Sequence, residues 1–141
     1  MAPALALLLG ACAPALYTPP HLAQDPPPAH VVTDSDEVTL VPKNLHQEIY
    51  ITRVDDASTY RLCWNISLCW PKQALLPPGR HHLQLHYEMI AVYANALLWL
   101  DAEPGQSYIV RRKLEGYGVR LWVEEVGTGK VVGGIAGSEP P

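Results

Sequence analysis

Strict alternation of apolar and polar residues is the feature that most constrains how this chain can fold. The longest such run alternates Leu83, Leu85, Tyr87 and Met89 with His82, Gln84, His86 and Glu88. Successive side chains of a strand point to opposite faces, so the run predicts a β-strand with one buried face. Shorter runs of the same kind recur through residues 37–133, separated by Gly, Pro and Asp. Strands at this spacing are typical of an all-β protein.

The number of these runs predicts an antiparallel β-sandwich of about seven or eight short strands. The segment from Met89 to Glu103 is ambiguous, because it is rich in Ala and Leu without Gly or Pro and would also suit a buried helix. As a strand, it would place Ala96, Leu98, Leu100 and Ala102 on one face and Leu97, Trp99 and Asp101 on the other. Neighbouring strands on both sides favour a hairpin, which we expect to turn near Asn95.

The first 36 residues differ in composition from the rest. The apolar run from Ala4 to Leu9 has the length of a signal-peptide core and is shorter than the roughly 20 residues that span a bilayer. Prolines then crowd residues 13–36, a composition that favours extended polyproline conformation over a packed core. We expect a signal peptide at 1–11, a lipid anchor and disordered tether at 12–36, the β domain at 37–133 and a disordered tail at 134–141.

The residues around Cys12 allow two kinds of processing. Leu9-Gly10-Ala11-Cys12 resembles the lipobox of bacterial lipoproteins, whose cysteine becomes the lipidated first residue of the mature chain. Ala11-Cys12-Ala13 also fits the small-x-small pattern of secretory cleavage, which would discard Cys12 and leave a domain without lipid. The lipobox resemblance implies firm anchoring by several acyl chains. With Ala13 after the cysteine, it also implies the outer membrane, with the domain facing the periplasm.

The number of cysteines favours the lipobox. The chain holds three, and an odd cysteine in an exported protein requires an explanation. Lipid on Cys12 leaves Cys63 and Cys69, which we expect to form a disulfide that closes a loop of about seven residues. The alternative is a redox or nucleophilic thiol, which no Cys-x-x-Cys spacing supports.

Two further stretches resemble uncharacterised bacterial lipoproteins. The first runs from Leu76 to Leu85 through the turn Pro77-Pro78-Gly79, and the second runs from Asp101 to Tyr108 through Pro104-Gly105. The resemblance implies a small β-sandwich and no known activity.

Histidines supply half of a candidate binding face. His82 and His86 share one face of the predicted strand, but four strand residues span about 13 Å, too far for both to bind one metal ion. His81 points to the opposite face because it neighbours His82. We therefore expect a solvated polar face and no metal site, unless an adjacent strand supplies further ligands.

Tryptophans supply the other half of this face. Trp99 and Trp122 fall opposite Leu98 and Leu121, which are the expected core residues. Exposed indoles would offer a surface to a partner or a glycan. A second buried sheet face is the alternative.

No catalytic pair emerges from the acidic residues. Glu124 and Glu125 point to opposite faces of a strand, and Asp55-Asp56 occupies a predicted turn, so neither pair converges on one substrate atom. Alternation also splits the basic cluster Arg111-Arg112-Lys113 between two faces. The chain contains no serine-hydrolase elbow, P-loop, dinucleotide fingerprint or His-Glu-x-x-His motif. We expect no enzyme and no cofactor.

Charge narrows the range of partners. The net charge of −4 and a pI near 5.8 argue against nucleic acid, which requires a basic surface. The sequence thus favours a non-enzymatic envelope lipoprotein that is attached to the membrane through lipid and presents a β domain to a protein partner. The alternatives are a periplasmic ligand- or metal-binding module and a secreted domain without lipid.

Overall fold

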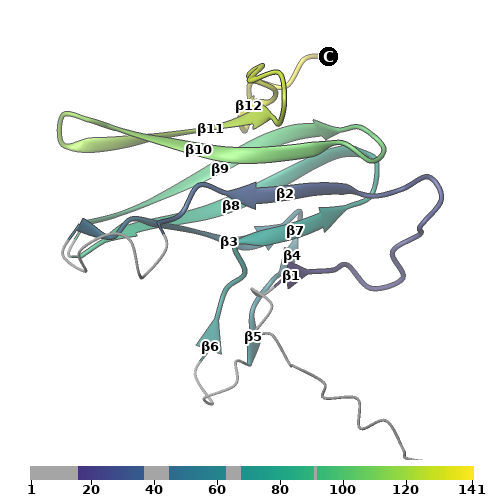
Figure 1. The fold of residues 1–141 in the computed structure, drawn as a ribbon, viewed down its shortest axis with the longest axis horizontal. Coiled ribbons are helices and arrows are strands. Elements are labelled where there is room, and N and C mark those ends of the chain that lie inside the picture. Colours follow the sequence, from purple (N-terminus) through teal and green to yellow (C-terminus); the bar gives the residue numbers. More distant parts are fainter. Residues whose placement is uncertain (1–15, 37–44, 63–67, 91) are drawn as a thin grey trace, which may run out of the picture.

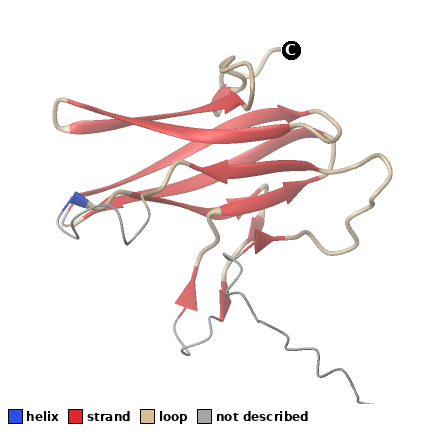
Figure 2. Ribbon diagram, viewed as in Figure 1, coloured by secondary structure: helices blue, strands red, loops and turns tan. Residues whose placement is uncertain are grey.

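The structure is a computed structural model that describes residues 16–36, 45–62, 68–90 and 92–141. In these residues strands form nearly all of the regular structure and no α-helix occurs, which confirms the all-β class (Figure 2). No helix long and apolar enough to cross a membrane is found in them. The strands are Leu16–Tyr17 (β1), Ala29–Thr33 (β2), Glu48–Val54 (β3), Ala57–Ser58 (β4), Arg61–Leu62 (β5), Leu68–Cys69 (β6), Gln73–Leu76 (β7), Gly79–Met89 (β8), Val92–Ala102 (β9), Ser107–Glu115 (β10), Gly118–Glu125 (β11) and Gly134–Ile135 (β12).

Ten of these strands form two five-stranded sheets that share one core, as in a β-sandwich (Figure 1). One sheet has the order β1-β7-β2-β10-β11 and the other β12-β9-β8-β3-β4. The remaining described strands, β5 and β6, pair with each other and project below the sheets in Figure 1. Most neighbours are antiparallel as expected, but β1 and β7 are parallel, as are β2 and β10.

The core forms where the inner faces of the two sheets meet. Leu83, Leu85 and Tyr87 of β8 are fully buried, while the residues between them face outward. On β9 the same alternation buries Leu98 and Leu100. The period-2 pattern therefore identified the inner face of both strands correctly.

The long hairpin is present, but its turn is not where the sequence predicts. β8 and β9 pair along their whole length, and the last pair before the connection between them is Met89 with Val92. Asn95 lies inside β9 opposite His86. The expected turn near Asn95 is therefore wrong, because the pairing of eleven residues on each strand outweighs the local turn preference of one asparagine.

The expected tether at 12–36 is wrong from Leu16 onward. β2 lies in the middle of its sheet between β7 and β10, and its Ala29 and Val31 are fully buried. The prolines lie in the connection from β1 to β2, where the carbonyl of Pro27 accepts a hydrogen bond from Gly105 N–H at 3.0 Å. They precede the strand and do not interrupt it. The average composition of residues 13–36 therefore concealed the five residues that form β2. The domain thus begins before residue 37.

The expected disordered tail at 134–141 is also wrong. β12 pairs with β9 at Trp99 and Leu98, which brings the C-terminal residues back to the sheet. Gly133 permits this approach, since a Cβ built on it would lie 2.0 Å from the carbonyl oxygen of Trp99. The sequence shows the glycine but not the strand that it approaches.

A matched pair of isosteric substitutions tests the position of β2. Val31→Thr should lower the free energy of unfolding by about 2 kcal/mol, because it buries a hydroxyl in an apolar core. Val32, its partly exposed neighbour on the other face, should tolerate the same change within about 0.5 kcal/mol. Urea denaturation of both variants measures the difference, and equal, small effects would restore the tether.

A second pair tests the docking of the C-terminal residues. Gly133→Ala should detach them, because the new Cβ collides with the backbone of Trp99. Hydrogen exchange of the Ala136 amide, which donates to the carbonyl of Leu97 at 2.9 Å, should then accelerate. Gly127→Ala is the control, since Gly127 also has a positive φ but no atom within 4 Å of its Cβ position. Equal exchange in both variants would contradict the docking.

Candidate functional site

The predicted binding face is divided between the two sheets. His82, His86 and Trp99 lie on the outer face of the sheet that contains β8 and β9, and His82 is directly opposite Trp99. Trp122 lies on β11, on the outer face of the other sheet. The prediction that the two tryptophans face away from the core is confirmed. The prediction that these four residues form one face is wrong, because a sandwich has two outer faces.

The C-terminal residues cover part of the first face. Trp99 Nε1 donates to Ser138 Oγ at 3.0 Å, and the His82 ring contacts the Glu139 carboxylate, which holds the pKa of Glu139 below its usual range. Arg80 lies over the Trp99 ring at 5.1 Å and makes two hydrogen bonds to Asp101, at 2.7 and 3.0 Å. Most side chains of this outer face therefore contact other residues of the same chain.

The remaining predicted residues have partners within the domain. His86 Nδ1 lies 2.9 Å from Asn95 Oδ1, and the ring stacks on Tyr93. On the other sheet, Trp122 Nε1 donates to Glu124 at 2.9 Å, and this bond together with Arg111 lowers the pKa of Glu124. None of these groups is arranged around a shared empty site.

Cys69 is disulfide-bonded. Its expected partner, Cys63, lies outside the described residues, so their pairing stays a prediction. The expected signal peptide, the lipobox-like residues and Cys12 also lie outside the described residues, so these predictions stay untested.

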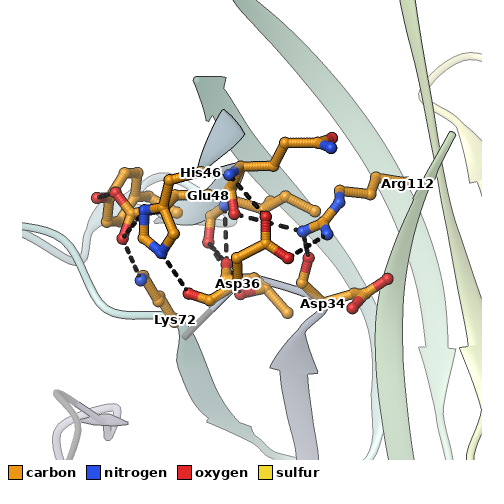
Figure 3. A network of polar contacts seen from close by, with 11 residues as sticks. Asp34, Asp36, His46, Glu48, Lys72 and Arg112 are labelled. Atoms are coloured by element: carbon orange, nitrogen blue, oxygen red, sulfur yellow. Dashed lines mark hydrogen bonds and ion pairs between the residues drawn. The ribbon is translucent and has the colours of Figure 1, made fainter. Parts of the chain in front are cut away.

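A polar cluster that the sequence reasoning missed joins the two sheets. Arg112 donates to the carbonyl of Asp34, to the carboxylate of Asp36 at 2.8 Å and to the carbonyl of Gln47 at 3.3 Å (Figure 3). The second oxygen of Asp36 accepts the Gln47 N–H at 2.8 Å. Alternation along β10 places Arg112 on the inward face with Tyr108. A charged residue at an inward position was the sequence signal that could have predicted this cluster.

The cluster continues through His46 to Glu48, which accepts hydrogen bonds from Lys72 at 2.6 Å and from Tyr50 (Figure 3). Burial alone would raise the pKa of Glu48, but these partners outweigh it and lower that pKa. Burial also opposes ionisation of Asp36, yet Gln47 and Arg112 hold the pKa of that carboxyl below its ordinary value. In the described residues no buried side-chain nitrogen or oxygen lacks a partner. The polar groups of the cluster therefore hold one another and link the residues before and after 37–44 to β10.

An aspartate–histidine pair at the turn from β3 to β4 has the same character. His81 is nearly buried, with Nδ1 2.8 Å from Asp55 Oδ2 and Nε2 2.7 Å from the carbonyl oxygen of Pro77. In a hydrolase triad the second ring nitrogen must accept a proton from the nucleophile. Here the carbonyl oxygen of Pro77 occupies that nitrogen, so the pair ties the turn to β8 and does not have the geometry of such a triad.

A cleft of about 640 Å³ opens between the sheets where β9 and β11 form their borders. Glu115 and Arg120, an ion pair at 3.3 Å, lie at this cleft. Its apolar lining includes Ala94, Ala96, Leu98, Val119, Leu121 and Ile135. Unlike the polar clusters, these side chains carry no polar group that needs a hydrogen-bond partner. The cleft can therefore accept an apolar ligand.

Small side chains on β9 explain why the cleft exists. Ala94 and Ala96 occupy the inner face of β9 where larger residues would fill the interior. Leu114 of β10 also points inward by alternation, yet it remains 46% exposed. The alternation predicted that Ala96 faces inward, but not that the opposite sheet would leave it uncovered.

Metal binding receives no support from the geometry. In the described parts of the chain, no group of three or more His, Cys, Asp and Glu side chains is placed to hold a metal ion.

Comparison of the chain with protein-family models, curated proteins and solved structures gives no match. The resemblance to bacterial lipoproteins therefore stays a prediction.

The polar cluster yields a pH-dependent prediction. Because the folded-state pKa of Asp36 is depressed, its stabilisation is complete above the unfolded-state pKa and is lost as pH falls through the folded value. Asp36→Asn should therefore cost about 2 kcal/mol of unfolding free energy at neutral pH, and this cost should shrink as pH falls through the folded-state pKa of Asp36. Urea denaturation at neutral pH and at a series of acidic pH values tests this.

Asp101→Asn is the matched control, because the ion pair of Asp101 with Arg80 is exposed and contributes little. An equal loss in the two variants, or a loss for Asp36→Asn that persists in acid, would contradict the role given to the cluster.

Proposed function

We propose that this protein is a lipid-anchored protein of the bacterial cell envelope whose β domain binds another protein and catalyses no reaction. The observation that carries the proposal is the apolar cleft between β9 and β11, which offers a binding surface without catalytic groups. The ionisable groups that do meet, in the Arg112 and His81 clusters, bind one another. The lipobox-like Leu9-Gly10-Ala11-Cys12 supports the location at the outer membrane.

The start of β1 changes how such an anchor would act. Three residues separate Cys12 from Leu16, and an extended residue spans at most about 3.6 Å. A lipid on Cys12 would therefore hold the domain within roughly 15 Å of the membrane surface, with no long tether.

The cleft lies on the side of the domain that faces away from this anchor. β1 and β11 are the two edge strands of the same five-stranded sheet. Neighbouring strands are about 4.8 Å apart, so the two edges are separated by about 19 Å. In Figure 1, β1 is at the lower border and β11 near the upper one. A domain attached at β1 would leave the cleft accessible to a partner in the periplasm.

Metabolic labelling tests the anchor. In a diderm bacterium, the full chain should incorporate radiolabelled palmitate and fractionate with the outer membrane. Cys12→Ser should abolish the label, whereas Cys69→Ser, which removes a cysteine far from the lipobox, should retain it. Label that survives Cys12→Ser would place the lipid on another residue, and wild-type chain that is released without label would favour a secreted domain. Either result would overturn the proposed anchor.

A further inference from the structure

Two strand edges lie on the same side of the sandwich, and the C-terminal residues cover only part of them. Val132 N–H donates to the carbonyl of Val123 on β11, and Ala136 N–H donates to that of Leu97 on β9, both at 2.9 Å. Beyond these contacts, no strand of the described residues pairs with the outer edge of β11 at Gly118–Trp122. The uncovered edges lie beside the apolar cleft.

Alternation identifies the backbone groups on the uncovered edge. In an antiparallel strand, every second residue directs both its N–H and its C=O to the same side. Val123 directs its carbonyl outward to Val132, so Leu121 and Val119 direct theirs to the same open side. Their side chains meanwhile line the cleft. Hydrogen-bonding groups and an apolar surface thus lie side by side.

The C-terminal residues show what kind of chain suits this position. Val131 makes an antiparallel bridge to Glu124 of β11, and Gly134 and Ile135 then pair antiparallel with β9. Extended chain therefore already occupies one half of this side of the sandwich. The uncovered edge of β11 at Gly118–Trp122 continues in the same direction and presents the same backbone N–H and C=O groups.

We infer that a partner protein adds one extended segment of its own, antiparallel to the free edge of β11, with alternate apolar side chains in the cleft above Ala94 and Ala96. This inference rests on the proposed function and names the class of partner. An acyl chain would fill the apolar space but would leave the edge N–H and C=O groups of Val119 and Leu121 without partners. A peptide strand satisfies both, and its polar side chains would alternate toward solvent.

Peptide selection tests the inference. A phage-displayed library of random twelve-residue peptides is panned on the purified full-length chain, and enriched peptides are synthesised and titrated by calorimetry. We expect sequences that alternate apolar and polar residues. Ala96→Leu, which fills the cleft, should weaken their binding at least about tenfold. Ala57→Leu is the control, since it makes the same change at an exposed site on β4, at the opposite border of its sheet.

Hydrogen exchange identifies the edge that is used. Bound peptide should slow exchange of the Val119 and Leu121 amides, while those of Tyr93 and Asn95 on β9 stay unchanged. Protection of the β9 amides alone would overturn the assignment to β11. Circular dichroism confirms that each variant is folded, so that lost binding is not lost structure.

Three other outcomes would overturn the inference. The first is a library that yields no enriched peptide. The second is binding of free palmitate that Ala96→Leu abolishes, which would make the cleft an acyl-chain site. The third is self-association in sedimentation that Ala96→Leu reverses, which would make a second copy of the chain the occupant. A chain that incorporates palmitate at Cys12 yet binds no peptide would leave the envelope anchor intact and remove only strand addition.

Discussion

The pairing of β2 with β7 on one side and β10 on the other is the interaction on which the rest of the sandwich depends. β2 joins strands that are far apart in sequence, and without it the sheet would fall into two pieces. Its buried Ala29 and Val31 also form part of the shared core. A segment preceded by prolines therefore supplies the centre of a sheet, while those prolines lie in the connection before it.

Directly after β2 the chain leaves one sheet for the other, and the polar cluster around Arg112 holds this crossing. Removing a guanidinium from water is costly unless hydrogen-bond acceptors and an opposite charge replace the water. Asp36 and the carbonyls of Asp34 and Gln47 supply both, from the segments that leave β2 and enter β3. Arg112 thus links β10 to both of these segments.

The sandwich is closed unequally along its borders, and the proposed function rests on this difference. Near β12 the C-terminal residues lie across the gap between the sheets, held by Trp99, His82 and the approach of Gly133. Farther along the same side, the small side chains of Ala94 and Ala96 leave the cleft open. An exposed strand edge normally invites uncontrolled association, and its position beside an apolar cleft is the feature that supports the proposal of a partner.

Local pattern determined the inner faces of β8 and β9, because the alternation of apolar and polar side chains lies in adjacent residues and requires no knowledge of neighbouring strands. The position of Asp55 at a turn was likewise predictable from the local sequence. Only the tertiary structure decided the position of β2 and the docking of residues 134–141. It also placed Trp99 and Trp122 on different sheets and left the cleft open. Each of these features depends on which distant strand pairs with or faces the segment. Periodicity fixes the direction of a side chain, whereas only the pairing of distant strands fixes what it meets.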